Sequence, residues 1–550
     1  MGRPGLMPWL DIKYNDYVVD KISESCDYFA IDLNCKIHPT CFRVINSNPT
    51  ISCLKELQLL QIKAIINDID NLIQMVNPLI GVYIATDGVC PVAKMKQQRY
   101  RRFKSISDKT LWDNIKKKHN NFNESSVFWN NSAITPGTKF MEKLHLEILK
   151  YVKNSDKNII YSSCYSPSEG EHKILQFIKL NINNSYVIYG LDADLIFLSL
   201  SSQCENIFLL RESNEINPKS KSTDFKYIKI ELMKNYIFKI IQTKIIYPLN
   251  KKNIINDFIF ICYFLGNDFL PELNSIDIYD SKIGIDYLLN TYSIVIKQLE
   301  YKYLINNDSF NIDMDFFSNF IKILADDENM ILKERYYKSS IKNKFIANPY
   351  DREIYKIENL LFKIDDPIKL GYDDRDTKLD KEGWRERYYK YNWDVSADEL
   401  ENFSKSVVEH YLKGLKWMTL YYFDKIPSWD WYFPFDFPPL MHDIHKYLIN
   451  INNIPLELSY PMKPFMQLLT VLPPQSYYLL PETFHKIITN PKSSLAYLYP
   501  IKFEQNFINK KKHWMGIPIL PPMDINLIKY IHNKYTNELS EEDLVRNKTI

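Results

Sequence analysis

The sequence predicts an α/β fold in which a parallel sheet carries acidic side chains along one edge. Three short apolar runs, rich in Tyr, Ile and Val, predict the strands and lie at residues 28–32, 82–87 and 186–194. Runs of this length and composition are typical of buried strands. Each run ends in acidic residues, namely Asp32, Asp87, Asp192 and Asp194. Because ligands of open α/β sheets bind beyond the carboxyl ends of the strands, we expect these acids to lie together.

The chain is long enough for two domains. Its 550 residues exceed what one hydrophobic core usually holds. Strand-like runs alternate with helical stretches over residues 1–240, which predicts a doubly wound domain. Over residues 241–550 longer helical patterns dominate, such as 403–423, and proline marks the turns between them, which predicts a mainly helical second region. The polar segment 105–132 is expected to form surface loops or weak helices.

Composition excludes several classes of protein. The net charge is only +2, from 69 basic and 67 acidic residues, so only a local cluster of charge can attract a polyanion. The eight cysteines form no C-x-x-C pair and are too few for a disulfide framework. No apolar run reaches transmembrane length, and residues 1–6 lack the apolar segment of a signal peptide. We therefore expect an intracellular protein, cytoplasmic rather than nuclear, that does not contact membranes.

Two further acidic motifs enlarge the predicted cluster to seven carboxylates. They lie at residues 167–173 and 266–271 and contribute Glu169, Glu171 and Asp268. Carboxylates crowded at one sheet edge repel one another and raise each other's pKa unless cations neutralise them. Hard divalent ions such as Mg²⁺ or Mn²⁺ do this with oxygen ligands. The sequence therefore predicts a metal site at this edge.

Each acid also has a simpler interpretation. Ser168 and Glu171 fit a helix capping box, an interpretation about as good as metal binding when taken alone. Asp268 can close the turn after an apolar run, and strand-end acids often cap. A D-x-D after a strand also opens haloacid-dehalogenase-type phosphatases, but those normally have Thr or Val where this chain has Leu195. These alternatives explain single acids better than they explain the set of seven.

A basic helical face follows Asp87 directly. Lys94, Gln98, Arg101 and Arg102 have the spacing i, i+4, i+7, i+8, which places them on one side of a helix. Such a face beside the acids can hold a terminal phosphate through charge-assisted hydrogen bonds. For a lone basic helix a solvated face is the commoner interpretation, and the position after a predicted metal ligand favours phosphate binding instead.

Aromatic residues form a third group. The densest cluster spans residues 428–435 and contains Trp429 and Trp431, and His38 lies six residues beyond Asp32. Rings of this kind can stack on unpaired bases. More often such a cluster belongs to a domain core and a single histidine is structural, so the pattern alone does not decide.

Together these motifs resemble those of the XRN family of 5′→3′ exoribonucleases. The similar blocks lie at residues 1–4, 32–38, 87–103, 134–138, 169–174, 189–195, 266–269, 428–432 and 463–469. They span nearly the whole chain and stop short of the extra C-terminal domains of the family's large cytoplasmic members, so we expect a compact member. Thirteen Gly against 39 Tyr, with abundant Asn, Ile and Lys, is typical of an AT-rich genome such as that of a large DNA virus.

The resemblance implies a PIN/flap-endonuclease-like α/β nuclease core over residues 1–240, with residues 241–550 completing the active site and RNA channel. The seven acids match the family's metal-binding residues, implying two Mg²⁺ or Mn²⁺ ions, and the basic face matches its 5′-monophosphate pocket. His38 with Trp429 or Trp431 matches the region where leading bases stack. The implied partner is single-stranded RNA with a 5′-monophosphate, degraded as in mRNA decay to nucleoside 5′-monophosphates. One departure is Ser168, where the family usually has Gly.

Two other functions stay open at this point. One is a flap, structure-specific or DNA exonuclease built on the same core, which the motifs around Trp429 and Lys463 disfavour. The other is a catalytically silent RNA-binding scaffold, which the presence of all seven acids disfavours. The sequence identifies no protein partner.

Overall fold

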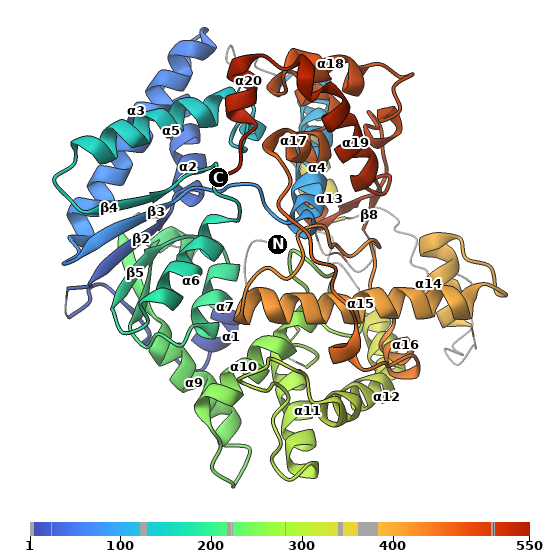
Figure 1. Ribbon diagram of the computed structural model, residues 1–550. Coiled ribbons are helices and arrows are strands. Elements are labelled where there is room, and N and C mark those ends of the chain that lie inside the picture. Colours follow the sequence, from blue (N-terminus) through green and yellow to red (C-terminus); the bar gives the residue numbers. More distant parts are fainter. Residues whose placement is uncertain are drawn as a thin grey trace.

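The computed structural model describes residues 5–23, 25–121, 129–216, 222, 224–280, 282–338, 345–360, 383–507, 510 and 512–550. A sheet of seven strands, in the order β1-β7-β6-β5-β2-β3-β4, forms the N-terminal part (Figure 1). Strands β2 to β6 pair in parallel, whereas β7 runs antiparallel to β6 and β1 antiparallel to β7. The strands are β1 (Val18–Val19), β2 (Tyr28–Asp32), β3 (Gly81–Ala85), β4 (Ile159–Ser162), β5 (Tyr186–Tyr189), β6 (Ile207–Glu212) and β7 (Phe225–Lys229).

Helices cover both faces of this sheet because side chains alternate along each strand. Phe29 and Ile31 of β2 point to one face, against α2, α3 and α5, while Ala30 points to the other, against α6, α7 and α9. The predicted doubly wound α/β architecture is confirmed. The helices of this part are α1 (Leu6–Asp11), α2 (Asn34–Ser47), α3 (Leu54–Val76), α4 (Val92–Lys118), α5 (Lys139–Asn154), α6 (Gly170–Leu180), α7 (Asp194–Ser201), α8 (Ser213–Ile216) and α9 (Ile230–Gln242).

The strand order contains a topological switch point at β2. From β2 the chain adds β3 and β4 on one side, then returns to place β5 and β6 on the other. In open α/β sheets such a reversal leaves a crevice outside the carboxyl ends of the strands, where ligands bind. Strands β2, β3 and β5 are the ones whose predicted runs end in acids, so the topology directs those acids to this crevice.

The second region is mainly helical, as predicted, and α15 contains the predicted helix 403–423. In Figure 1 this helix runs from α7 across to α14. Helices α17, α18 and α19 lie above it in this view, around α4. The elements are α10 (Lys251–Cys262), α11 (Ile285–Gln298), α12 (Met314–Lys338), α13 (Pro349–Glu358), α14 (Trp384–Trp393), α15 (Leu400–Phe423), α16 (Met441–Lys446), α17 (Pro464–Val471), β8 (Gln505–Asn506), β9 (Ile517–Pro518), α18 (Glu482–Thr489), α19 (Ile525–Tyr535) and α20 (Glu541–Arg546).

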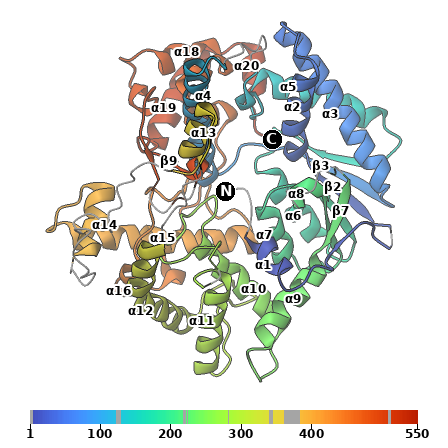
Figure 2. The ribbon, with the colours of Figure 1, turned by 180° about the vertical axis from the view of Figure 1, so that it is seen from behind.

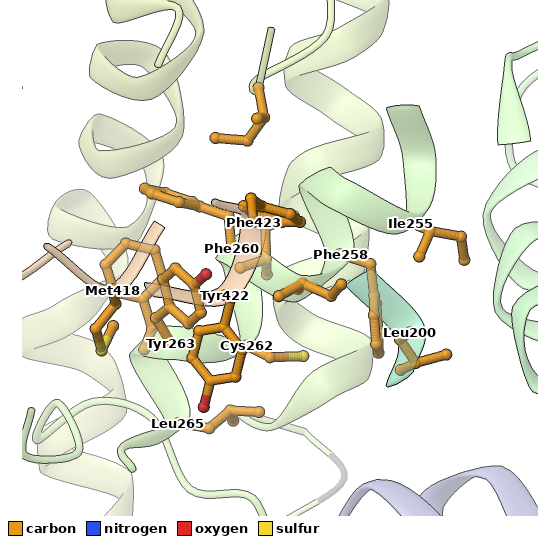
Figure 3. Packing of buried hydrophobic residues seen from close by; sticks show 14 of the residues in the cluster. Leu200, Ile255, Phe258, Phe260, Cys262, Tyr263, Leu265, Met418, Tyr422 and Phe423 are labelled. Carbon is orange, nitrogen blue, oxygen red and sulfur yellow. The ribbon is translucent and has the colours of Figure 1, made fainter. Parts of the chain in front are cut away.

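One apolar core joins the two regions. Leu200 of α7, Phe258 of α10, Tyr263 just after α10 and Tyr422 of α15 belong to the same buried cluster (Figure 3). The rings of Tyr263 and Tyr422 stack with centroids 5.6 Å apart. This core packs α15 against the N-terminal α/β part. Because the two regions share it, the structure does not separate them at residue 240, and the domain boundary there stays a prediction.

Helix α4 extends further than its sequence suggested. It continues through the polar stretch 105–118, for which loops or weak helices were expected, and residues 122–128 lie outside the described part. The helix packs against α13, α17 and β9 of the second region, and Figure 2 shows α13 and β9 beside it from behind. These tertiary contacts stabilise a segment whose own composition is a weak helix former. Among the described residues, no helix is long and apolar enough to cross a membrane.

Candidate active site

Six of the seven predicted acids follow the carboxyl ends of strands or begin helices at the switch point. Asp32 ends β2, Asp87 follows β3, and Asp192 and Asp194 follow β5. Glu169 and Glu171 lie at the start of α6. The seventh, Asp268, comes from the loop after the 3-10 helix Tyr263–Leu265, and the structure brings all seven close enough to act on one another's charge.

Close backbone approach at Gly170 makes this gathering possible. A Cβ atom at Gly170 would lie 2.7 Å from Oδ1 of Asp32, so no larger residue fits there without displacing the carboxylate. The Gly170 amide donates to Oδ1 of Asp87 at 2.7 Å, and the Asp87 amide donates to Oδ1 of Asn34 at 3.1 Å. The start of α6 therefore ties the ends of β2 and β3 together.

Burial and mutual repulsion raise the pKa of several of these carboxyls, Asp32, Glu171 and Asp194 among them. Burial, and then the charge of Asp87, raise the pKa of Asp32 to about 8. Burial and Asp192 raise the pKa of Glu171 well above its ordinary value, and burial and Asp268 do the same for Asp194. Such a cluster gains from a bound cation, because a positive charge offsets the repulsion that these shifts express.

Several carboxylate oxygens in the cluster have no hydrogen-bond partner. Both oxygens of Glu171 and Oδ1 of Asp32 are buried and unpartnered. Unpaired buried charges are costly, and hard cations satisfy them with oxygen ligands. Even so, no group of three or more His, Cys, Asp or Glu side chains within the described residues is spaced as a formed metal site. The donor chemistry fits a divalent ion, while the side-chain geometry needs adjustment to hold one.

The Lys94 side chain accounts for part of that geometry. Its Nζ atom lies 2.7 Å from Oε1 of Glu169 and 2.7 Å from Oδ2 of Asp268. Burial is the largest single influence and raises the pKa of Asp268, but the Lys94 ammonium and further positive charges, Arg101 among them, together lower it. Lys94 is 6% exposed, so this is a buried ion pair with two of the predicted metal ligands.

Two tyrosines of α15 bond to the acid cluster and were not singled out from the sequence. The Tyr421 hydroxyl donates to Oε2 of Glu169 at 3.1 Å, and the Tyr422 hydroxyl donates to Oδ1 of Asp194 at 3.2 Å. Both tyrosines are almost fully buried. The helix prediction for 403–423 placed them on a helix, but nothing in the sequence indicated which face meets the acids.

The capping box predicted at Ser168 and Glu171 does not form. Helix α6 begins at Gly170 with Glu169 as its N-cap, and no side-chain capping bond is present there. The Ser168 hydroxyl instead lies 3.3 Å from Nδ1 of His172, whose Nε2 lies 3.2 Å from the Tyr421 carbonyl oxygen. Because a carbonyl only accepts, Nε2 of His172 donates and Nδ1 accepts from Ser168. Glu171 is thereby left free for the cluster.

The predicted basic face lies on α4, as its spacing indicated. Arg102 donates through Nη2 to Oγ1 of Thr135 at 2.8 Å, while its Nη1 is buried without a hydrogen-bond partner. Gln98 accepts through Oε1 from Nε2 of Gln467 at 3.1 Å, and Arg101 is exposed. An unpaired buried guanidinium nitrogen beside a second arginine suits an anionic ligand.

The three predicted stacking residues differ in accessibility. His38 is half-buried near the arginines, and burial together with the charges of Arg101 and Arg102 lowers its pKa to about 4, which keeps the ring neutral at pH 7. Trp431 is 8% exposed and stacks on Trp417 with centroids 5.1 Å apart, within the core. Trp429 is half-buried, and its carbonyl accepts from the amide of Val92 at the start of α4.

A cavity of about 420 Å³ opens beside the acids. Asp192, Asp194 and Asp268 line one part of it, and Tyr100 and Arg101 of α4 line another. Its volume lies within the range of small-ligand sites, roughly 300 to 1,000 Å³. The acid cluster is therefore reachable from a space bordered by the basic helix.

Comparison with protein families covers nearly the whole chain. Residues 1–213 match the family model described as XRN 5′-3′ exonuclease N-terminus. Residues 248–360 and 363–550 match the model described as Xrn1 helical domain. The two matches are consecutive and together include every residue predicted for the site.

Curated relatives carry related names. A protein of Arabidopsis thaliana named 5′-3′ exoribonuclease 2 is 29% identical, over 95% of this chain and 64% of that protein. A protein of Homo sapiens named 5′-3′ exoribonuclease 1 is 28% identical, over 100% of this chain and 35% of that protein. The chain thus spans less than two thirds of the length of either relative.

Solved structures give weaker matches. The catalytic core of Rad2 in complex with a DNA substrate is 14% identical with a TM-score of 0.28, over 71% of this chain and 91% of that chain. Flap endonuclease-1 from Methanococcus jannaschii is 15% identical with a TM-score of 0.24, over 58% of this chain and 96% of that chain. TM-scores of this size carry no argument about function.

Proposed function

Since this chain belongs to the XRN family of 5′-3′ exonucleases, we propose that it is a 5′→3′ exoribonuclease that removes nucleoside 5′-monophosphates from single-stranded RNA bearing a 5′-monophosphate. One observation carries the proposal. The seven carboxylates, four of them buried, adjoin a helix face on which the Nη1 atom of Arg102 is buried and unpaired. Acids that favour a cation beside a basic group that favours an anion suit hydrolysis of the phosphodiester next to a 5′-phosphate.

The acids would hold two Mg²⁺ or Mn²⁺ ions. Asp32 and Glu171 offer unpaired oxygens, and Asp87, Glu169, Asp192, Asp194 and Asp268 complete the set. When bound, such ions supply a nucleophilic hydroxide and stabilise the leaving oxygen. Tyr421 and Tyr422 would orient Glu169 and Asp194 through their hydroxyls, leaving the other oxygen of each carboxylate for an ion.

Lys94 would contact both the acid cluster and the 5′-phosphate. Its ammonium is paired with oxygens of Glu169 and Asp268, and those two side chains would hold an ion in the metal-loaded protein, so the Lys94 side chain would then be released. The released side chain would turn towards Gln98 and Arg102, which lie one and two turns along the same face of α4. It would then meet the 5′-phosphate, as the family resemblance implies.

The 5′ end would be held by Lys94, Gln98, Arg101 and Arg102. A monophosphate fits such a pocket, whereas a cap or triphosphate adds bulk and charge at the same point. The neutral His38 ring and Trp429 would stack on the leading bases, because a neutral ring near two arginines adds no further positive charge. The core position of Trp431 supports Trp429 over Trp431 in this role. We assign residues 1–240 to the nuclease core and residues 241–550 to completing the site.

Substitution of Arg102 tests the pocket. Arg102→Met removes the unpaired guanidinium, so the preference for 5′-monophosphate over 5′-hydroxyl RNA should fall by about tenfold or more, the value of a charge-assisted hydrogen bond. The measurement is kcat/KM on both RNAs. Arg43→Met is the matched control, because Arg43 is 58% exposed and pairs with Asp68 on α2 and α3. Equal loss on both RNAs would argue against the pocket.

A further inference from the structure

Gln467 joins the second region to the basic face of α4. It lies on α17, is 1% exposed, and contacts Cys90 just before α4 and Gln98 within it. The sequence motif at 463–469 contains Gln467, but its spacing indicated no partner. A fully buried glutamine is costly unless its amide is hydrogen-bonded, so these two bonds explain how it is tolerated.

The bond to Cys90 fixes the direction of the Gln467 amide. A backbone N–H can only donate, so the Cys90 amide, 3.3 Å away, requires the carbonyl oxygen Oε1 of Gln467 as acceptor. The Nε2 group of Gln467 then points the other way and donates to Oε1 of Gln98 at 3.1 Å. The assignment of amide oxygen and nitrogen, often ambiguous, follows here from the backbone donor.

The same logic fixes Gln98. Because its Oε1 accepts from Gln467, its Nε2 is the end left for a ligand. Gln98 lies one turn from Arg102, whose Nη1 is buried and unpaired and whose Nη2 is held by Thr135. Thr135 in turn donates to the carbonyl of Ser132 at 2.7 Å, so its hydroxyl oxygen is oriented to accept from the arginine.

We infer that Gln467 is a positioning residue that sets the polarity of Gln98, so that a donor rather than an acceptor meets the 5′-phosphate. The inference rests on the proposed function and adds the selectivity element that the second region supplies to it. A reversed Gln98 would present its carbonyl oxygen to phosphate oxygens, which repel it. The backbone N–H of Cys90 thus determines, through two successive hydrogen bonds, that the Nε2 group of Gln98 faces the ligand.

Two substitutions of Gln467 separate polarity from packing. Gln467→Met keeps the volume but removes both bonds, and we expect binding of a 5′-phosphorylated RNA pentamer, relative to its 5′-hydroxyl form, to weaken about tenfold. Gln467→Glu keeps an acceptor for the Cys90 amide but has no donor for Gln98. Gln98 would then donate its Nε2 to the carboxylate and present Oε1 to the phosphate, so the loss of preference should be larger than in Gln467→Met. Fluorescence anisotropy in EDTA measures both ratios without cleavage. In cleavage assays KM should rise while kcat stays near the wild-type value.

A double-mutant cycle identifies action through Gln98. Gln98→Leu should lower the ratio by itself, and Gln467→Met should add nothing further in that background. Thr470→Val is the matched control, because Thr470 lies one turn along α17, is 2% exposed and bonds only within its helix. Melting temperatures verify that each variant is folded.

The outcomes are distinct. Wild-type selectivity in both Gln467 variants, or additive losses in the double mutant, would overturn the inference while leaving the proposed function intact. No preference for a 5′-phosphate in the wild-type protein would overturn the pocket and the inference together. The expected result has two parts. Both Gln467 variants lose preference for 5′-phosphorylated RNA, and the double mutant loses no more than Gln98→Leu alone.

Discussion

Ser168 has a backbone conformation that suits glycine, with φ at +93°. A non-glycine residue there is strained by roughly 1 kcal/mol or more. Its amide donates to Val89, its carbonyl accepts from Gly88, and its hydroxyl bonds His172, so three contacts hold it in place. The family resemblance implies glycine at this position, which would adopt this φ without strain, and the hydroxyl bond offsets part of the strain at Ser168.

His172 makes the free energy of unfolding depend on pH. It is 3% exposed, and burial lowers its pKa from 6.5 to about 4. Between those values the unfolded chain binds a proton at this position and the folded protein does not, so its contribution to stability is present above pH 6.5 and is lost as the pH falls towards 4. The loss amounts to about 3 kcal/mol.

Urea denaturation across this pH range measures it. His172→Gln keeps a donor for the Tyr421 carbonyl but cannot be protonated, so its stability should fall less steeply between pH 6.5 and 4 than that of the wild type. His442→Gln, at an exposed side chain, is the control. Identical slopes in the wild type and His172→Gln would contradict the assignment of a buried neutral imidazole.

The positions of the strand-end acids were predictable from the sequence, whereas the partners of the acids were not. Period and strand length located Asp32, Asp87 and the Asp192 and Asp194 pair at strand ends, since the sheet directs parallel ends to one crevice. That Lys94 pairs with Glu169 and Asp268 depends on which rotamer a buried lysine adopts among several carboxylates. Sequence spacing places Lys94 on a helix face but does not specify that choice, so its role as a phosphate ligand stays a proposal.

At the scale of elements, α4 connects the two regions. Arg99 is 2% exposed and donates to the carbonyls of Pro521 at 2.7 Å and Leu498 at 2.6 Å. Its guanidinium also lies 5.3 Å from the centre of the Phe103 ring. Two carbonyls of the C-terminal segments are thus satisfied by one side chain of a helix that begins beside the acid cluster.

Arg99→Met should therefore destabilise the protein by about 3 kcal/mol, because it leaves two buried carbonyls without donors. Guanidinium denaturation measures the change. Arg101→Met is the control on the same helix, since Arg101 is exposed and its loss should change the free energy of unfolding by less than about 0.5 kcal/mol. A loss at Arg99 no larger than that at Arg101 would show that α4 does not depend on this contact.

Element prediction worked where apolar periodicity was strong. Strands β2, β3 and β5 and helix α15 contain apolar runs whose residues are buried in the structure. For the continuation of α4 through 105–118 the sequence left loops and weak helices both open, because its polar residues show no apolar stripe. There the helix depends on partners far along the chain, such as Trp112 against His513 and Lys118 with Glu353. Propensity is a weak guide where tertiary contacts decide.

For the whole molecule, the proposed active site draws on both regions. The N-terminal α/β part supplies six acids, while Asp268, Tyr421, Tyr422 and Gln467 come from residues beyond 240. The shared core of α7, α10 and α15 holds Asp268, Tyr421 and Tyr422 in position, while Gln467 lies on α17, which packs with α4 in a second core. The sequence predicted the α/β and helical architecture, but not that one core would join the two, because packing between distant segments leaves no local pattern.

The central claim is a metal-dependent exoribonuclease selective for a 5′-monophosphate. The most direct test digests body-labelled single-stranded RNA carrying a 5′-monophosphate, triphosphate, cap or hydroxyl, with Mg²⁺ or with EDTA, beside the Asp192→Ala protein and a DNA of the same sequence. We predict release of nucleoside 5′-monophosphates from the monophosphorylated RNA alone, with Mg²⁺ alone, and none from Asp192→Ala. RNA that stays bound but uncleaved under every condition, or DNA degraded as fast as RNA, would contradict the account.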